Sequence, residues 1–476
     1  MENKIYELLD SDFNTVAYRF KTDIGTFDIP IEVLEKELEY FPESDGKMQS
    51  TDKQGIVSLS AKHNARTILY KHLKLGRKEL EYSRITFGLI MGNSLLKLIE
   101  RGNTANHRNC FDKVKAFLDN TDITKQNILS LYGVKHTGKT FLMYQAVQYL
   151  RDKGISLDKI AFITISPDKT EALELMQYIT MLVEVYEIKY VFIDEITYVK
   201  DELSLLTELS DCYFKVKFVL TGTNSAGFLP LFRQYLYGRT LRVSTSYISY
   251  NEYIKLAGDC GTREYLRRGG TLLTGTLCAS THKTYLEQWA EIGEEYINTA
   301  IIQNLFSTIR QSDYFSDNYS SLSNMYYEDS ESLKTLLFKY LGKYSEPLAV
   351  QALTETLNIC TKEVANAVRF EENLVKPLLC FSTLSEENDF TAEAFRGLLN
   401  GIGCLSENLN TGKKFLVPVG LYYGLVCVTL SKLANRYYEL AHRYNIPLSW
   451  AEFADLLVQT TERILIEEDF TTVYRD

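Results

Sequence analysis

The sequence predicts an α/β fold in which a parallel sheet is covered by helices on both faces. A short apolar strand, 127–132, leads through a glycine-rich loop into a segment with helical spacing, 141–150. A second apolar strand, 190–193, runs into two carboxylates, as a buried parallel strand does when its carboxyl end opens into a site. Strands and helices alternate around these two segments, which is the pattern of a parallel sheet.

The loop after the first strand fits the phosphate-loop pattern Gly-x-x-x-x-Gly-Lys-[Ser/Thr]. Its glycines let the backbone curl so that N–H groups and a helix N-terminus face a polyphosphate. Lys139 is predicted to reach the β and γ phosphates, and the hydroxyl of Thr140 to bind Mg²⁺. A glycine-rich turn that only caps a helix is the alternative, and the flanking strand and helix argue against it. We assign the nucleotide contacts to Gly133, Lys135, His136, Thr137, Gly138, Lys139, Thr140 and Phe141.

The second apolar strand ends in Asp194 and Glu195. Asp194 is predicted to hold Mg²⁺, directly or through water, and Glu195 to polarise the water that attacks the γ-phosphate. A solvated strand end would look the same in isolation, but this one follows the phosphate loop with one further strand between them. The second acid favours hydrolysis over simple nucleotide binding, because a site that activates water needs such a group.

The other elements of the sheet are predicted in order along the chain: a strand at 159–166, a helix at 171–185, a helix at 202–209 and a strand at 217–221. A polar residue where that last strand ends, beside the acidic strand, can reach the γ-phosphate or the attacking water. We assign this role to Asn224, with Thr221 and Thr223 as rivals. A simple turn made of turn-forming residues is the other interpretation.

The motifs occur in the order of a known family. Between about residues 110 and 310 the chain resembles the AAA-like bacterial and archaeal ATPases of the AAA_14/DUF4143 type. The resemblance rests on the loop, the strand ending in Asp194-Glu195-Ile196, the turn 221–225, Gly238-Arg239, and the stretches 249–253 and 265–270. It implies ATP as the nucleotide and makes Arg239 a candidate for sensing phosphate charge. An arginine at the surface is the alternative interpretation of Arg239.

Two activities are disfavoured. Family members often end in a winged helix followed by a nuclease-like fold with Asp/Glu-x-Lys acids, but no such motif follows residue 330, so DNA cleavage is not predicted. No Asn-Lys-x-Asp motif for reading a guanine base follows the sheet, which argues against a GTPase. We therefore expect ATP and Mg²⁺ as the cofactors.

Composition sets the outer limits. The chain has 476 residues, 45% of them apolar, which is enough for two to four folded domains. No Cys-x-x-Cys pair and no opening signal segment occur, so we expect a cytoplasmic protein with reduced thiols. The longest apolar run, 415–430, is too short to span a bilayer and is predicted to be a buried strand and helix. The formal charge of −10 favours a protein partner over nucleic acid and leaves a homo-oligomer open.

Five regions are expected: a helical N-terminal accessory region at 1–109, a P-loop ATPase domain at 110–245, a helical lid at 246–311, a polar linker at 312–332 and a helical, winged-helix-like domain at 333–476. In the accessory region the helical patterns are at 31–38 and 61–75. In the last region they are at 333–341, 347–357 and 361–374, and 415–417 is a candidate wing strand. The helix 361–374 mixes basic and acidic residues, so it is expected to face protein and not DNA.

The sequence thus predicts Mg²⁺-dependent ATP binding and hydrolysis that changes the conformation of a partner. A nucleotide-gated binding switch with little turnover, like the STAND regulators, is the alternative. Glu195 favours the ATPase, whereas the absence of a recognisable effector motif leaves the switch open.

Overall fold

The computed structural model describes most of the chain from residue 87 onward and four short strands before it. The described residues are 4–9, 15–22, 25–30, 81–84, 87–103, 106–120, 126–166, 170, 172–199, 202–213, 215–222, 238–268, 283–311, 319–362, 369–371, 375, 389–407, 414–443 and 448–467.

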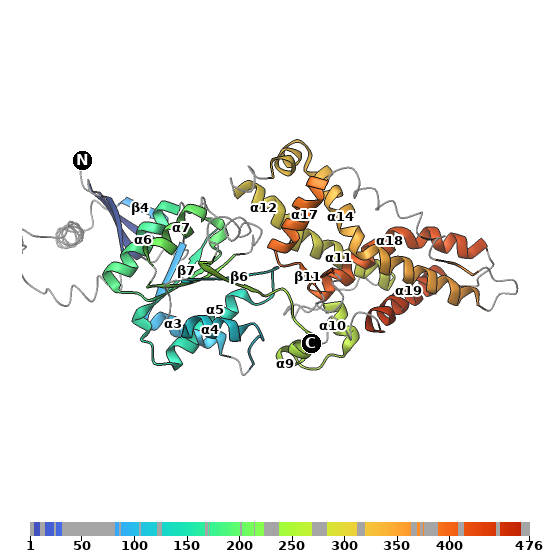
Figure 1. Ribbon diagram of the computed structural model, residues 1–476, viewed down its shortest axis with the longest axis horizontal. Coiled ribbons are helices and arrows are strands. Elements are labelled where there is room, and N and C mark those ends of the chain that lie inside the picture. The colour runs from blue at the N-terminus through green and yellow to red at the C-terminus, as the bar shows by residue number, and fades with distance from the viewer. Residues whose placement is uncertain are drawn as a thin grey trace, which may run out of the picture.

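A six-stranded sheet forms the centre of the first half of the molecule (Figure 1). Its strands in spatial order are β10 (Thr240–Ser244), β6 (Ile128–Tyr132), β9 (Lys217–Thr221), β8 (Tyr190–Asp194), β7 (Ile160–Ile165) and β5 (Phe87–Met91). The five strands from β10 to β7 are parallel, and β5 closes the edge antiparallel to β7. The four inner strands, β6, β9, β8 and β7, are almost continuous apolar runs because both of their faces are buried, whereas β10 at the edge is mostly not buried.

Helices cover both faces of this sheet (Figure 1). One face packs on α3 (Leu95–Gly102), α4 (Phe111–Asp119) and α5 (Lys139–Asp152), and the other on α6 (Ala172–Tyr186) and α7 (Glu202–Cys212). Because β6, β9 and β8 are parallel neighbours, their carboxyl ends meet at one edge of the sheet. That edge carries the phosphate loop, the acidic pair and the polar strand tip predicted from the sequence.

The N-terminal region differs from its prediction. Its described residues before the central sheet are strands, in a four-stranded sheet of order β3-β2-β1-β4. These strands are β1 (Lys4–Leu9), β2 (Thr15–Thr22), β3 (Gly25–Pro30) and β4 (Glu81–Arg84). Apolar residues alternate with polar ones in β2, and this period of two is the signal that the helical expectation overlooked. The predicted helical patterns at 31–38 and 61–75 lie outside the described residues. In addition, β5 and α3 belong to the central sheet and its cover, so the predicted boundary at 109/110 is too late.

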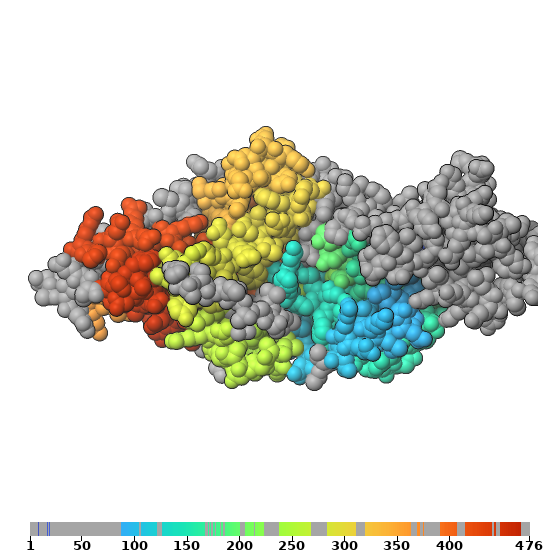
Figure 2. Space-filling model, turned by 180° about the vertical axis from the view of Figure 1, so that it is seen from behind, coloured from blue at the N-terminus to red at the C-terminus, as the bar shows by residue number. Residues whose placement is uncertain are grey.

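The second half of the molecule is a helical body with one core. In the space-filling view its segments, coloured from green to red, lie together on one side of the molecule (Figure 2). It comprises α9 (Tyr250–Ala257), α10 (Thr262–Arg268), α11 (Tyr285–Ile297), a π-helical segment (Asn298–Ile302), α12 (Gln303–Gln311), α14 (Ser320–Thr361), α17 (Asp389–Gly401), the strands β11 (Leu405–Glu407) and β12 (Lys414–Leu416), α18 (Val419–Arg443) and α19 (Trp450–Ile464). The predicted lid and C-terminal domain share this core, so they are not separate units. No helix in the described ranges is long and apolar enough to cross a membrane.

Two expectations within the helical body need correction. The linker predicted at 312–332 is helical from Ser320 onward, with a break at Asp329. Leu322 is buried there, with Met325 and Tyr326 packed on the core, at helical spacing within a polar stretch. The patterns at 333–341 and 347–357 form one helix, which ends at Thr361, and the part of 361–374 that is described beyond Lys362 is not helical.

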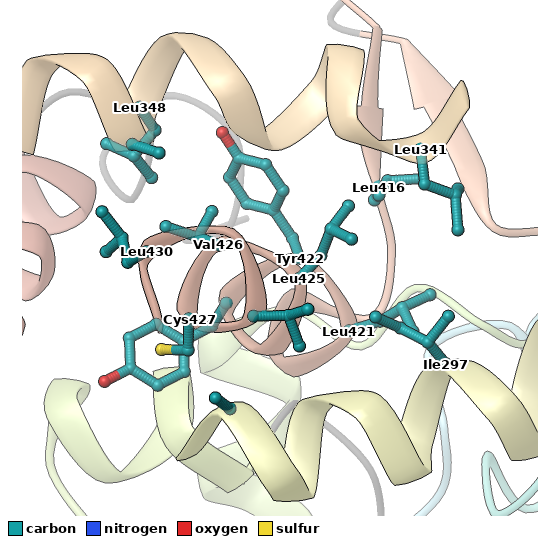
Figure 3. Close-up of a cluster of buried hydrophobic side chains, with 14 of the residues drawn as sticks. Ile297, Leu341, Leu348, Leu416, Leu421, Tyr422, Leu425, Val426, Cys427 and Leu430 are labelled. Atoms are coloured by element: carbon teal, nitrogen blue, oxygen red, sulfur yellow. The ribbon is translucent and has the colours of Figure 1, made fainter. Parts of the chain in front are cut away.

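The apolar run 415–430 is a buried strand and helix, as predicted. The helix is α18, and it crosses α11 so closely that two glycines meet. A Cβ atom on Gly293 would lie 2.4 Å from the carbonyl oxygen of Gly424. Apolar side chains of α18 fill the space between α11 and α14, among them Leu421, Leu425 and Leu430 (Figure 3). A strand, β12, overlaps the position 415–417 predicted for a wing strand, and it pairs antiparallel with β11.

Candidate nucleotide-binding site

The phosphate loop lies between β6 and α5. Gly138 has a φ of 83° and immediately precedes the first residue of α5, and His136 also lies in the left-handed region with a φ of 64°. Gly133 is required by contact, because a Cβ atom there would come within 2.5 Å of the Thr245 hydroxyl and 2.8 Å of the Ser246 hydroxyl. The loop thus turns sharply against the end of β10 before it starts the helix.

Lys139 is the first residue of α5 and is buried. Its Nζ donates hydrogen bonds to the carbonyl oxygens of Gly133 at 2.9 Å and Val134 at 2.8 Å. Burial lowers the pKa of Lys139 to about 8, and the carboxylates of Glu195 and Asp194 partly oppose that shift. A cation with so little water around it interacts strongly with any anion placed in the loop.

Asp194 connects the loop with two strands. It lies at the carboxyl end of β8 and accepts hydrogen bonds from the hydroxyl of Thr140, at 3.0 Å to Oδ2, and from the hydroxyl of Thr221. Burial raises the pKa of Asp194, and the hydrogen bond from Thr221 opposes this effect. Thr140 and Asp194 therefore present a hydroxyl and a carboxylate side by side. Hard oxygen donors of this kind suit Mg²⁺, which completes its shell with waters and phosphate oxygens.

Glu195 follows directly and has a φ of 62°, which is unusual for a residue other than glycine. Its backbone N–H donates to the hydroxyl of Thr221 at 3.2 Å, and the residue is half-buried. Backbone strain of this kind concentrates at functional sites. Thr221 thus holds both acids, because its hydroxyl contacts the carboxylate of Asp194 and the amide of Glu195.

The other predicted loop residues lie where the motif puts them. Lys135 is half-buried and His136 is exposed at the tip of the loop, where burial and then the charges of Lys135 and Lys139 lower the pKa of His136. Thr137 is fully buried, and its hydroxyl bonds to the carbonyl of Val134 at 2.9 Å. Phe141 lies half-buried in the first turn of α5.

Two residues assigned to the site from the sequence have other outcomes. Asn224 and its rival Thr223 lie outside the described residues, whereas the other rival, Thr221, is in the site. Arg239 is not brought to the site. It precedes β10, whose first residue pairs with Ile128 at the amino end of β6, and it forms an exposed ion pair with Asp211. The phosphate loop follows the carboxyl end of β6. Arg239 therefore lies too far away to sense the charge of a phosphate bound in the phosphate loop of the same chain.

Comparison with known families agrees with this geometry. Residues 125–254, which run from before β6 into α9, match the family AAA_14, described as an AAA domain. We refer to this segment as the AAA domain, after the family that it matches. No curated protein matches the chain.

Among solved structures the chain is similar to a Walker-type ATPase of Pyrococcus abyssi, with 13% identity and a TM-score of 0.31 over 68% of this chain and 97% of that one. It is also similar to the ORC2 protein of Aeropyrum pernix, with 10% identity, a TM-score of 0.28 and coverage of 73% and 100%. For DnaA from Aquifex aeolicus with AMPPCP bound, the identity is 12%, the TM-score 0.26 and the coverage 77% and 97%. Scores this low transfer no function to this chain.

A buried ion pair that was not predicted from the sequence joins the AAA domain to the residues before it. Arg108, just before α4, pairs with Glu252 of α9, and each side chain is only 3% exposed. The two residues are 144 positions apart in the chain. No periodicity or spacing links them, so only the folded chain reveals the pair.

The loop of the AAA domain also touches the helical body. The N–H of Val134 donates to the hydroxyl of Ser246 at 3.0 Å, and that hydroxyl lies 3.4 Å from the carbonyl oxygen of Ile402, at the end of α17. A Cβ atom on Gly403 would approach the same hydroxyl to 3.0 Å. The side chain of Val134 is buried in the core of the helical body. Ser246 therefore connects the phosphate loop with the helical body.

Proposed function

We propose that this chain binds Mg²⁺·ATP in the AAA domain and hydrolyses it. The observation that carries the proposal is the cluster around Asp194, in which the hydroxyls of Thr140 and Thr221 both bond to one buried carboxylate. When Mg²⁺ is bound it neutralises charge on the β and γ phosphates. Thr140 and Asp194 would hold the ion, Lys139 the phosphates, and Glu195 would orient and polarise the attacking water.

We further propose that turnover changes the position of the helical body and thereby acts on a partner. The contact of Ser246 with both Val134 and Ile402 supports this coupling, since a movement of the loop on binding phosphate alters a bond that the helical body shares. Packing between buried elements is discrete, so small shifts at such a contact are passed on as rigid movements.

The charge of this chain favours a protein partner over nucleic acid. The formal charge is −10. Two arginines of α10 face one buried carboxylate: Arg267 donates two hydrogen bonds to Glu462, and Arg263 lies 3.8 Å from it. Glu462 partly balances their charge, so they attract the phosphates of DNA less strongly. Binding of labelled duplex DNA at physiological salt would argue against this assignment.

The nucleotide-gated switch is the second candidate. It is favoured by the same Ser246 contact, because nucleotide occupancy alone can set that contact without hydrolysis. The steady rate of phosphate release by the wild-type protein separates the two candidates.

The test uses two substitutions in the site and one outside it. Lys139→Ala should weaken Mg²⁺·ATP binding, because the lysine supplies the positive charge that faces the phosphates. Glu195→Gln should keep binding and lose turnover on the order of a hundredfold, as expected for loss of a general base. Glu187→Gln, an exposed glutamate paired with Lys159, is the matched control and should behave as wild type.

Three outcomes would each change the proposal. Unchanged ATP affinity in Lys139→Ala would refute the phosphate-loop assignment. ATP binding by the wild type with no phosphate release under any condition would select the switch. Equal turnover in Glu195→Gln and wild type would remove Glu195 from the mechanism.

A further inference from the structure

Arg108 bonds to three separate segments of the AAA domain. One Nη atom donates to the carbonyl oxygen of Thr137 in the phosphate loop. The other donates to the carbonyl oxygens of Thr245 at 3.1 Å and Tyr247 at 2.8 Å, beyond the end of β10. Nε donates to Glu252 in α9. All three nitrogens of the planar guanidinium are therefore used, and a lysine could not reproduce this fork.

The bond to Thr137 has a consequence on the other side of the same peptide. The carbonyl of Thr137 and the N–H of Gly138 belong to one planar trans peptide unit, so they point in opposite directions. Arg108 holds the carbonyl towards the interior. The N–H of Gly138 is thereby directed to the other face, where the phosphate-loop motif places backbone donors for phosphate.

Glu252 fixes the guanidinium itself. One of its carboxylate oxygens accepts from Arg108 and also from the backbone N–H of Asn109 at 2.9 Å. The amide of Glu252 is in turn bonded to Ser249, which caps the start of α9. Breaking a buried ion pair leaves an uncompensated charge. Moving the guanidinium of Arg108 away from Glu252 would therefore cost free energy.

We propose that Arg108 is a positioning residue for the phosphate loop: it sets the orientation of the Thr137–Gly138 peptide and so the affinity for the β and γ phosphates of ATP. This inference rests on the proposed ATP binding. It makes a specific claim, because the residue acts on the part of the affinity that comes from those phosphates and not on binding of the rest of the nucleotide.

The experiment compares affinities for Mg²⁺·ATP and for AMP, which lacks the β and γ phosphates. They are measured by competition against a fluorescent ATP analogue in the full chain. The variants are Arg108→Lys, which keeps the charge but not the fork, and Arg108→Met, which keeps only the bulk. Arg463→Met is the control, since Arg463, on α19, forms exposed ion pairs with Glu355 of α14 and with Glu467.

Both Arg108 variants should bind ATP about tenfold or more weakly, while AMP affinity stays within about twofold of wild type, as expected for loss of an aligned donor to a charged group. Added guanidinium ion should restore part of the ATP affinity of Arg108→Met but not change wild type. Arg463→Met should match wild type for both ligands.

Equal losses for ATP and AMP, or unchanged ATP affinity, would overturn the inference while leaving the proposed function intact. If Arg108→Met does not fold, Arg108→Lys decides, and failure of both to fold would make the arginine a structural residue and overturn the positioning role. A wild-type protein that bound no ATP would overturn the proposed function together with this inference.

Discussion

Lys139 is an ammonium group in a place with little water. Its Nζ is held by two carbonyl oxygens of its own loop, and its pKa is lowered to about 8 because burial disfavours the charged form. Partial charges of carbonyls stabilise the cation less than a triphosphate does. We therefore expect Lys139 to leave the carbonyl oxygens of Gly133 and Val134 and to bind phosphate oxygens when a triphosphate enters the loop.

This residue gives ATP affinity a dependence on pH. In the nucleotide-free protein the pKa of Lys139 is about 8, below its usual value of 10.5. Between these values the unfolded chain holds a proton that the native state has lost, so stability from this group rises with pH in that interval. A bound triphosphate favours the charged form, and ATP binding above pH 8 must therefore take up a proton.

We expect the Kd for ATP to be flat below about pH 7 and to rise by up to about tenfold per pH unit above about pH 8. Calorimetry in two buffers of different ionisation enthalpy measures the proton uptake directly. Lys139→Arg is the control, because a guanidinium does not titrate in this range. Proton uptake that persisted in Lys139→Arg would assign the effect to another group.

The sequence could locate this site but not arrange it. The spacing of the loop and the acidic strand predicted which residues meet, because those features depend on local patterns. The choice among Asn224, Thr223 and Thr221 depended on which polar group reaches the γ-phosphate or the attacking water. Of these three, Thr221 lies among the described residues, and its hydroxyl bonds to Asp194. Arg108 left no local trace, because three of its partners are backbone carbonyls, which every residue possesses, and the fourth, Glu252, is 144 positions away.

At the scale of elements, the sheet was predictable and the helical body less so. The predicted strand at 217–221 is β9, and the helix predicted at 171–185 is α6 within one residue at either end. Buried parallel strands are apolar throughout and so are visible in a sequence. Helices that share one core are harder to delimit, because a polar stretch such as 320–328 is helical only through what it packs against.

The α11–α18 pair shows what such packing demands. Glycine inside a helix is unfavourable by itself, yet Gly293 and Gly424 face each other at the crossing. Their missing side chains let the two backbones touch. The close approach holds the first helices of the body against its last long helix.

Gly293→Ala should therefore destabilise the protein by about 1–3 kcal/mol through overpacking, even though alanine favours helix. Chemical denaturation followed by circular dichroism measures the change. Gly88→Ala is the control, because nothing lies within 4 Å of a Cβ atom at that position in β5. A Gly293→Ala protein as stable as wild type would mean that the two helices separate without cost.

At the scale of the whole molecule, the phosphate loop is part of an interface between two halves. Val134 contributes to the core of the helical body although it lies in the loop of the AAA domain. The body in turn places the end of α17 and Gly403 against Ser246. From residue 87 onward, the described residues thus form a sheet domain and a body that meet beside the nucleotide site. This arrangement depends on contacts between residues more than a hundred positions apart.

If this interface passes on the state of the nucleotide, Mg²⁺·ATP should change amide hydrogen exchange in residues 389–407, which contain α17 and β11. Ser246→Ala should reduce that change, because it removes the only side chain seen in the described residues to bond both Val134 and Ile402. The N–H of Val134 is then left buried without this acceptor, which costs about 1–3 kcal/mol and loosens the loop from the body.

Ser345→Ala is the matched control. Ser345 is also a buried serine whose hydroxyl bonds to a neighbour, Thr429, but it lies between α14 and α18 within the body. Its variant should lose a similar amount of stability and keep the full response to ATP. Two results would contradict this prediction: amide exchange in residues 389–407 that ATP does not change in the wild type, or a change of the same size in Ser246→Ala. Either result would show that the contact through Ser246 does not couple the helical body to the phosphate loop.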